Sequence, residues 1–427
     1  MTIRFRKKLG WLRTSKATAR QVVRAARRAR TRTFPVRPAR PLVPYSEGEF
    51  AVPGKLRVLI IGGGIGGLAL AQGLHRAGVA VAVRERDISA AGRLQGYRLR
   101  LDPHGLDALD RLLPAPLSRA IWDASSTPSR TSYLTGTPPE EPVERNVSIN
   151  RRTLREILLH GLDDVVEFGR ECTGYRLDDT VTATFADGST ASADLLVAAD
   201  GVNSFIRRQY LPHARVVDTG VRIMYGRFPL TRETAALIPD EWFGIYRGLF
   251  GPDHQHIGIA PVHSRRPPSL PGLTDTSDYV MCLFAARTEL LPCADDELRA
   301  ATGRELRDMT VSLARKWNPK ASELLALADP ETLFPIFMRT SVPVEPWPTT
   351  SVTLLGDAIH AMSPAVGVGA NTALRDAELL ARKLTETDLL PALREYETEM
   401  ISYGFDAVRT SAKFGALRMG QPPLTRA

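Results

Sequence analysis

The sequence predicts an α/β protein in which a Rossmann-like parallel sheet is interrupted by an inserted antiparallel sheet. Three observations lead to this fold class. A β-branched run at Val58–Ile61 enters a glycine-rich turn and an amphipathic helix, the strand–turn–helix order of a dinucleotide-binding unit. Two later buried-strand patterns, at 193–199 and 351–355, each end at an aspartate beside a glycine. Between about 220 and 337, alternating strands are separated by proline-rich turns, which is typical of an antiparallel sheet.

The turn after the first strand has the pattern G-x-G-x-x-G. Its first glycine allows the tight turn, the second lets the backbone approach a pyrophosphate, and the third lets the helix pack closely on the strand. A second buried strand at 79–83 leads to an acid about 20 residues on, the position that binds a ribose hydroxyl. The pattern alone does not separate FAD from NAD. The cofactor-binding residues expected in this unit are Gly62, Gly64, Ile65, Gly66, Gly67, Glu85 and Arg86.

The positive charge of the chain is concentrated in an N-terminal tail. The net charge is +9, yet residues 1–42 contain 14 Lys and Arg and no acid, so the remaining 385 residues carry −5. We expect residues 1–53 to be a basic, disordered extension. Two alternatives for this extension remain open: it could contact acidic lipid or nucleic acid, or it could resemble a transit peptide.

The other composition data indicate a globular protein of the cytoplasm. Hydrophobic content is 43%, and the longest apolar stretch is too short and too rich in glycine to span a membrane. The three cysteines have no CxxC spacing, which argues against a disulfide scaffold or a zinc site. His254 and His256 could share a strand face, but no third ligand is spaced near them, so no metal site is expected.

The remaining elements follow from periodicity and turn residues. Helices are expected at 103–113, 146–162 (with Asn150 as N-cap), 296–316, 372–384 and about 389–414. Strands are expected at 96–101, 165–168, 174–177, 181–185, 193–199, 221–228, 242–250, 256–261, 279–285 and 351–355. Residues 122–145 are expected to form a loop with one strand at most.

The stretch from Gly356 to Ala377 carries the most specific pattern in the chain. It follows a buried strand and resembles the GDAAHxxxPxxGxGxNxAxxDA motif of the flavoprotein aromatic hydroxylases, single-component FAD-dependent monooxygenases of the para-hydroxybenzoate hydroxylase type, with Ile359 as the one departure. The stretch from Asp194 to Arg208 resembles the family's DG motif, and Arg151 to Leu154 its R-x-x-L element. The resemblance covers roughly residues 56–415 and is weakest between 220 and 335.

The resemblance implies an FAD-binding domain of the GR2 type, built from 54–95, 146–219 and 338–418, with 96–145 and 220–337 as the substrate-binding portion. It places Arg151 near the pyrophosphate or the flavin, Asp200 where the FAD and NADPH functions meet, and Asp357 at the ribityl or pyrophosphate region. Beside the flavin ring it places Pro364, Gly367, Gly369, Ala370 and Asn371. No catalytic acid or base is identifiable. Arg98 and His360 are weak candidates, and Tyr97 and Arg100 share the strand of Arg98.

The resemblance implies a monooxygenase that uses NAD(P)H and O2 and transfers oxygen from a flavin C4a-hydroperoxide. The expected reaction is hydroxylation or epoxidation of an apolar aromatic, polyketide or terpenoid molecule, as in antibiotic biosynthesis. The apolar character is inferred from Trp242, Phe243, Tyr246, Leu249 and Phe250.

Three alternatives remain open. A flavin-dependent halogenase would carry a WxWxIP segment, which Trp242, Trp317 and Trp347 do not form. An isoprenoid reductase has the same FAD fold. From another class, the chain could be a membrane- or nucleic-acid-binding protein with a vestigial FAD site. Intact motifs at three strand ends count against this, so no nucleic-acid partner is expected, and at most weak membrane contact through the tail.

Overall fold

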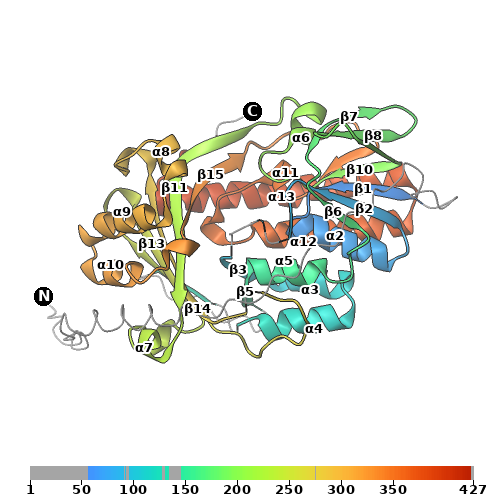
Figure 1. Ribbon diagram of the computed structural model, residues 1–427. Helices are drawn as coiled ribbons and strands as arrows, with labels where there is room; N and C mark the ends of the chain where they lie inside the picture. Colours follow the sequence, from blue (N-terminus) through green and yellow to red (C-terminus); the bar gives the residue numbers. More distant parts are fainter. Residues whose placement is uncertain are drawn as a thin grey trace, which may run out of the picture.

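The computed structural model describes residues 56–90, 92, 96–126, 130–133, 146–274 and 276–424. Its first layer is a five-stranded parallel sheet of order β16-β10-β1-β2-β6 (Figure 1). The strands are β1 (Arg57–Ile61), β2 (Ala80–Glu85), β6 (Val166–Phe168), β10 (Leu195–Ala198) and β16 (Val352–Leu354). Because all five run in the same direction, their carboxyl ends meet at one edge of the sheet, where ligands of open α/β sheets bind.

Helices and a small sheet cover the two faces of this layer. Helix α2 packs against α12, which in turn packs against α3 and α13. A three-stranded sheet contacts β1 and β10. The helices are α2 (Ile65–Arg76), α3 (Pro103–Leu112), α4 (Ala115–Ala124), α5 (Arg151–Leu159), α6 (Phe205–Tyr210), α11 (Asp357–His360), α12 (Gly369–Glu386) and α13 (Leu389–Met419). The small sheet comprises β7 (Cys172–Leu177), β8 (Val181–Phe185) and β9 (Thr190–Ala193).

The second layer is a six-stranded sheet of order β15-β11-β14-β13-β12-β4. Its pairs are antiparallel except β12 with β4, which is parallel. The strands are β4 (Arg130–Tyr133), β11 (Val216–Pro229), β12 (Ile245–Phe250), β13 (His256–Val262), β14 (Tyr279–Arg287) and β15 (Phe334–Ser341). The helices beside it are α7 (Arg232–Ala235), α8 (Asp295–Ala300), α9 (Gly303–Arg315) and α10 (Pro319–Leu325).

Alternation along β14 shows how the two faces of this sheet differ. Val280, Cys282 and Phe284 enter a core that they share with residues of α8, α9 and α10. Met281 and Leu283 belong to a separate cluster on the opposite face. Successive strand residues point to opposite faces, so one face packs under helices and the other is turned toward the first layer. In Figure 1, α12 and α13 run between the two layers.

The structure corrects three expectations. Residues 146–162 are not one helix: β5 (Val147–Asn150) pairs with β3 (Arg98–Leu101), and α5 begins after Asn150, whose side chain caps it by accepting from the Arg152 N–H at 2.8 Å. The helix expected at 296–316 is divided into α8 and α9, because Thr302 begins a new helix with a capping box to Glu305.

The segment 96–145 is also divided between the layers. Its apolar residues from Leu101 to Ala124 lie in the core of the first layer, and β4 pairs with β12 in the second. The expected tail at residues 1–53 lies outside the described residues. Within the part of the chain that is described, no helix is both long and apolar enough to cross a membrane.

Candidate active site at the meeting of the two sheets

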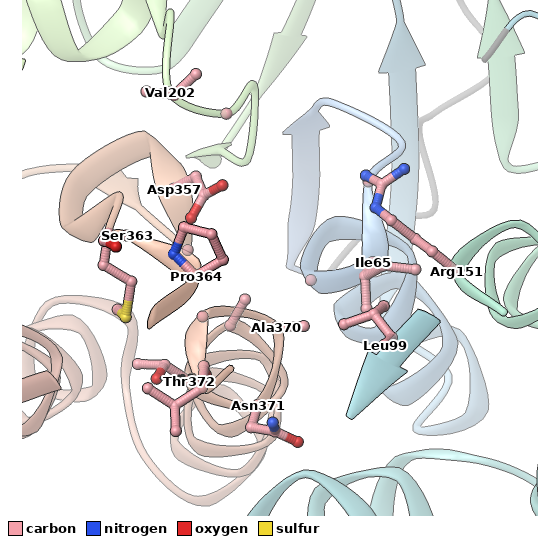
Figure 2. Close-up of a pocket in the computed structure, with 18 of the residues that line it drawn as sticks. Ile65, Leu99, Arg151, Val202, Asp357, Ser363, Pro364, Ala370, Asn371 and Thr372 are labelled. Carbon is pink, nitrogen blue, oxygen red and sulfur yellow. Dashed lines mark hydrogen bonds between the residues drawn. The ribbon is translucent and has the colours of Figure 1, made fainter. Parts of the chain in front are cut away.

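One large cavity lies between the carboxyl edge of the parallel sheet and the inward face of the six-stranded sheet. Its volume is about 1380 Å³, more than the roughly 300–1,000 Å³ of a pocket for one drug-sized ligand. Every predicted cofactor-binding residue lines it, as does Arg98, whereas His360 does not. Figure 2 shows Asp357 and Arg151 on facing walls, with Pro364 and Ala370 beside them. The volume is sufficient for a cofactor together with a second molecule.

The glycines of the turn after β1 have separate structural reasons. Gly62 has φ +113°, and a Cβ there would lie 2.3 Å from the Ala199 carbonyl oxygen. A Cβ at Gly67 would lie 2.2 Å from the Gly62 carbonyl oxygen, so this glycine lets α2 pack against the turn. A Cβ at Gly64 would meet no atom within 4 Å. Gly62 and Gly67 are therefore required by the fold, while Gly64 keeps the cavity side of the turn open to a ligand.

Glu85 ends β2 beneath this turn and is 1% exposed. Its carboxylate accepts the Gly63 N–H at 2.6 Å and the Asp87 N–H at 2.9 Å, which fixes its orientation. Arg155, which the sequence motifs do not predict as a site residue, donates to the carbonyl oxygens of Gly63 and Ala90 at 2.8 Å each. Its guanidinium lies 3.8 Å from Glu85 and 3.6 Å from Asp87. The only sequence signal for Arg155 is its place four residues after Arg151, one helical turn along α5.

Asp200 lies at the end of β10, between the two cofactor-facing turns. Its Oδ2 accepts the Phe205 N–H at 2.8 Å. Its Oδ1 is buried and has no hydrogen-bond partner among the described residues. Burial raises the pKa of the Asp200 carboxyl, against the opposing effect of the backbone hydrogen bonds. A buried acceptor oxygen at a cavity wall is suited to a hydroxyl of a bound ligand.

Asp357 opens α11 at the end of β16, and its side chain faces the cavity. Enclosure by the cavity walls raises the pKa of its carboxyl, while the charges of His360 and Arg151 act in the opposite direction. The guanidinium of Arg151 lies 5.6 Å from the Tyr97 ring centroid. A carboxylate and a guanidinium on facing walls can bind a hydroxyl and a phosphate of one ligand.

Asp376 on α12 holds the Asp357 turn in place. This carboxylate is 0% exposed and accepts from the Gly356 N–H at 2.8 Å, from the Tyr403 hydroxyl at 2.6 Å and from His360 Nε2 at 2.6 Å. Burial alone would lower the pKa of His360, but the charge of Asp376 and its hydrogen bond outweigh burial and raise it. His360, a weak catalytic candidate, therefore lies behind the cavity wall as a positioning residue.

The loop from Pro364 to Asn371 contributes mainly backbone to the cavity. Gly367 has φ +66°, which glycine adopts without strain. The Asn371 amide points away from Asp357 and Pro364 (Figure 2) and binds strand β3: it donates to the Arg100 carbonyl at 3.0 Å and accepts the Asp102 N–H at 3.0 Å. Asn371 thus fixes β3 beside the loop rather than presenting its side chain to a ligand.

The inward face of the six-stranded sheet forms the opposite wall. Tyr225 stacks on Tyr97 at 5.2 Å between ring centroids, and Phe334 stacks on Tyr225 at 6.0 Å. Burial lowers the pKa of Arg98, which lies above this wall on β3, to about 10. The aliphatic and sulfur-containing lining residues of the sheet are Ile223, Met281, Leu283 and Ile336.

Most of the aromatic and aliphatic residues from which an apolar ligand was predicted lie away from this wall. Of the five apolar residues named for β12 and its approach, only Tyr246 lines the cavity. Trp242, Phe243 and Leu249 pack in the core under α8–α10. His256 is not paired with His254: it is buried and shares a 2.7 Å hydrogen bond with the Tyr246 hydroxyl. Over the described ranges no group of three or more His, Cys, Asp or Glu side chains is arranged for a metal ion.

Comparisons with known proteins agree with this geometry. A family model described as FAD binding domain matches residues 307–389, and one described as NAD(P)-binding Rossmann-like domain matches residues 60–123. The 3-amino-4-hydroxybenzoate 2-monooxygenase PtmB3 of Streptomyces platensis is 31% identical, over 80% of this chain and 83% of the relative. A solved structure from Photorhabdus luminescens, described as an FAD-containing monooxygenase, superposes with a TM-score of 0.73 at 33% identity. The superposition covers 84% of this chain and 96% of the Photorhabdus luminescens chain.

This chain belongs to the FAD-dependent monooxygenase family. A further relative is the dual O-methyltransferase/FAD-dependent monooxygenase elcB of Phaeosphaeria nodorum, 33% identical over 78% of this chain. The chain spans only 40% of the length of elcB.

The cavity residues fit the cofactor that the family uses. Gly64 leaves the turn open where a pyrophosphate would approach, and Glu85 stands at the end of β2 for a ribose. Asp200 offers a buried oxygen without a partner in the described structure, and Asp357 faces the cavity. These residues, together with the cavity-lining loop at 364–371, would hold FAD.

Proposed function

We propose that this chain is an FAD-dependent monooxygenase that uses NAD(P)H and dioxygen to hydroxylate or epoxidise an apolar aromatic, polyketide or terpenoid small molecule. The observation that carries the proposal is that one continuous cavity joins the predicted cofactor-binding strand ends to the apolar face of the second sheet. A cavity lined only by the carboxyl edge of the parallel sheet would fit a protein that binds FAD and has no substrate. The inward face of the six-stranded sheet adds the space and the apolar surface that a substrate needs.

The overall reaction for hydroxylation is substrate–H + O2 + NAD(P)H + H⁺ → substrate–OH + H2O + NAD(P)⁺. When bound and reduced by NAD(P)H, FAD supplies the electrons that activate dioxygen. The protein binds and orients both partners and excludes water, since water would divert the reaction to peroxide. Ile223, Met281 and Leu283 serve the last purpose because their side chains present no polar group to the cavity.

The wall also supports a flat, mostly apolar substrate. Tyr97 and Tyr225 both line the cavity and stack on each other, while Phe334 stacks on Tyr225 without lining the cavity. Aromatic rings favour offset stacking on other flat π systems. PtmB3, a relative that the chain matches over most of its length, is named for an aromatic substrate, 3-amino-4-hydroxybenzoate. Both observations favour hydroxylation of a ring over epoxidation of an alkene.

The test is isotope incorporation with the FAD-loaded protein. It would be incubated under ¹⁸O2 with NAD(P)H and a panel of aromatic compounds that includes 3-amino-4-hydroxybenzoate and 2-naphthol. We expect one ¹⁸O atom in the product for each NAD(P)H and each O2 consumed, with little peroxide. Without substrate, NAD(P)H oxidation should be slow or should yield peroxide. A saturated or halogenated product without label would indicate a reductase or a halogenase instead. Failure to bind FAD would indicate a vestigial site.

A further inference from the structure

The last turn of α13 contacts the loop at 364–371 on one wall of the cavity. Helix α13 runs between the two layers (Figure 1) and packs against the short helical turn η5 (Pro364–Val366) of that loop. Arg418 donates from Nη1 to the Ala365 carbonyl at 2.6 Å, and its guanidinium lies 4.7 Å from the Phe414 ring centroid. Arg418 and Ala365 both line the cavity. One side chain of the C-terminal helix thus holds the backbone of the loop.

The two residues that follow Arg418 are fixed to the other wall, the six-stranded sheet. Met419 is 5% exposed and belongs to the apolar cluster on the inward face of that sheet, against which Ala365 also packs. The Gly420 carbonyl accepts a hydrogen bond from Nη1 of Arg287, at the end of β14, at 2.6 Å. Gly420 ends α13 with φ +66°, a left-handed conformation that glycine adopts without strain. The chain can therefore leave the helix at this residue and reach the sheet.

Close packing behind the loop leaves little freedom for the end of the helix. A Cβ at Gly415, one turn before Arg418, would lie 2.3 Å from Gln421 Oε1 and 3.1 Å from Ser363 Oγ. Ser363 is 1% exposed and precedes η5, where its hydroxyl accepts the Ala365 N–H at 3.3 Å. The helix therefore lies directly against the residue at which the loop begins, in a space that admits no larger side chain at position 415.

We refer to Arg418, Met419 and Gly420 as the C-terminal bridge. Building on the FAD-dependent monooxygenase proposed above, we infer that Arg418 is a positioning residue that fixes the loop at 364–371 relative to the six-stranded sheet. Its guanidinium makes a charge-assisted hydrogen bond, which is roughly twice as strong as a neutral one. Because Met419 and Gly420 are held by the sheet, the loop and the sheet keep one separation. The C-terminal bridge thereby keeps solvent away from the part of the cavity where the loop would contact FAD.

The test uses the FAD-loaded full-length chain and four variants. Arg418→Met removes the charged donor and keeps an unbranched side chain, and Arg418→Lys retains a charge and a donor. Arg287→Met removes the hydrogen bond to Gly420 without changing the cavity, which Arg287 does not line. Arg394→Met is the matched control, because Arg394 is exposed on the same helix and does not line the cavity.

Hydrogen exchange measured by mass spectrometry reports how firmly the loop is held. Its amides should exchange about ten-fold faster or more in Arg418→Met, the factor for loss of one charge-assisted hydrogen bond. Iodide quenching of the flavin fluorescence, which reports solvent access to FAD, should increase in the same variant. Arg287→Met should change both measurements in the same direction, Arg418→Lys should change them less, and Arg394→Met should match the wild type. If Arg418→Met fails to fold, Arg287→Met decides by the same two measurements.

Two outcomes would overturn the inference. One is loop exchange in Arg418→Met at the wild-type rate. The other is increased quenching in Arg418→Met with wild-type quenching in Arg287→Met, because Arg418 would then act through its own charge and not through a link to the sheet. Neither measurement requires a substrate or turnover, so both outcomes leave the proposed reaction standing. A protein that did not bind FAD would refute the proposed function, while hydrogen exchange on the FAD-free chain would still test the C-terminal bridge.

Discussion

A methyl group added at Gly64 should weaken FAD binding and leave the fold intact. Gly64 has φ −80° and ψ −177°, an extended conformation that alanine adopts freely, and its Cβ would meet no atom within 4 Å. The loss of a glycine N-cap, about 0.5–1 kcal/mol, is offset by about 0.4–1 kcal/mol from the lower entropy of the unfolded chain. The methyl would instead occupy the approach to the turn. Displacing a pyrophosphate from one backbone amide costs about 1.5–3 kcal/mol, so the Kd for FAD should rise by roughly 10- to 150-fold.

The same methyl at Gly67 should damage the fold itself. Its Cβ would lie 2.2 Å from the Gly62 carbonyl oxygen and 3.1 Å from the Ala199 Cβ, and the first of these neighbours is backbone that cannot rotate away. Overpacking of this kind costs about 1–3 kcal/mol or more, against about 1 kcal/mol gained by alanine in a helix. Because the clash is with backbone, we expect the upper end of this difference, a net destabilisation of up to about 2 kcal/mol, for Gly67→Ala.

Two measurements separate the variants. Denaturant unfolding of the FAD-free proteins should give the wild-type free energy of unfolding for Gly64→Ala and a lower value for Gly67→Ala. Fluorimetric titration with FAD should show weakened binding for Gly64→Ala. The reasoning would be refuted if Gly64→Ala bound FAD like the wild type, or if both variants lost the same stability.

Three further predictions concern the acids and the tail. Asp357→Ala should raise the Kd for FAD by about 10- to 150-fold through loss of a charge-assisted hydrogen bond, with an unchanged free energy of unfolding. Asp163→Ala, at an exposed position, is the control. Unaltered flavin retention in Asp357→Ala would show the residue to be only a helix cap. Asp376→Asn should lower the free energy of unfolding by about 3–5 kcal/mol at low pH. The pKa of His360 is raised in the folded protein, so the stability gained from its protonation is complete below about pH 6.5 and is lost as the pH rises through the folded-state pKa. A loss of unfolding free energy in Asp376→Asn that grew with pH would contradict this. Deletion of residues 1–45 should leave FAD content and NAD(P)H oxidation intact, and loss of flavin would show that the tail belongs to the fold.

The strand-end residues could be predicted from the sequence because their requirements are local. Gly62 needs a positive φ, and Gly67 needs contact with a carbonyl five residues earlier in the same turn. Both constraints act within one strand–turn–helix unit, and the sequence records them directly. Asp200 and Asp357 likewise follow buried strands, whose apolar runs predict that they end at the same sheet edge.

The substrate wall could not be predicted in this way. The aromatic residues around β12 have the alternation of a strand, but alternation does not tell which face meets helices and which meets the cavity. That choice depends on α8–α10, more than 40 residues later in the chain, which cover Trp242 and Leu249 and leave Tyr246 on the other face. The pairing of β5 with β3 is a second case. The sequence pattern at 146–150 predicted a helix, but these residues form a strand because they pair with a strand some 50 residues earlier in the chain.

The two aspartates of the Gly356–Ala377 stretch show why burial decides between roles that the sequence leaves equal. Asp357 and Asp376 stand in the same motif, and either could bind a ligand. Asp376 is fully buried, and its three hydrogen-bond donors come from β16, α11 and α13 or their adjoining turns. Its carboxylate therefore stabilises the turn that carries Asp357. Asp357 faces the cavity and is held there by that turn. A substitution at either residue should therefore reduce FAD binding, but only the one at Asp376 should reduce the free energy of unfolding, and this difference assigns each carboxylate its role.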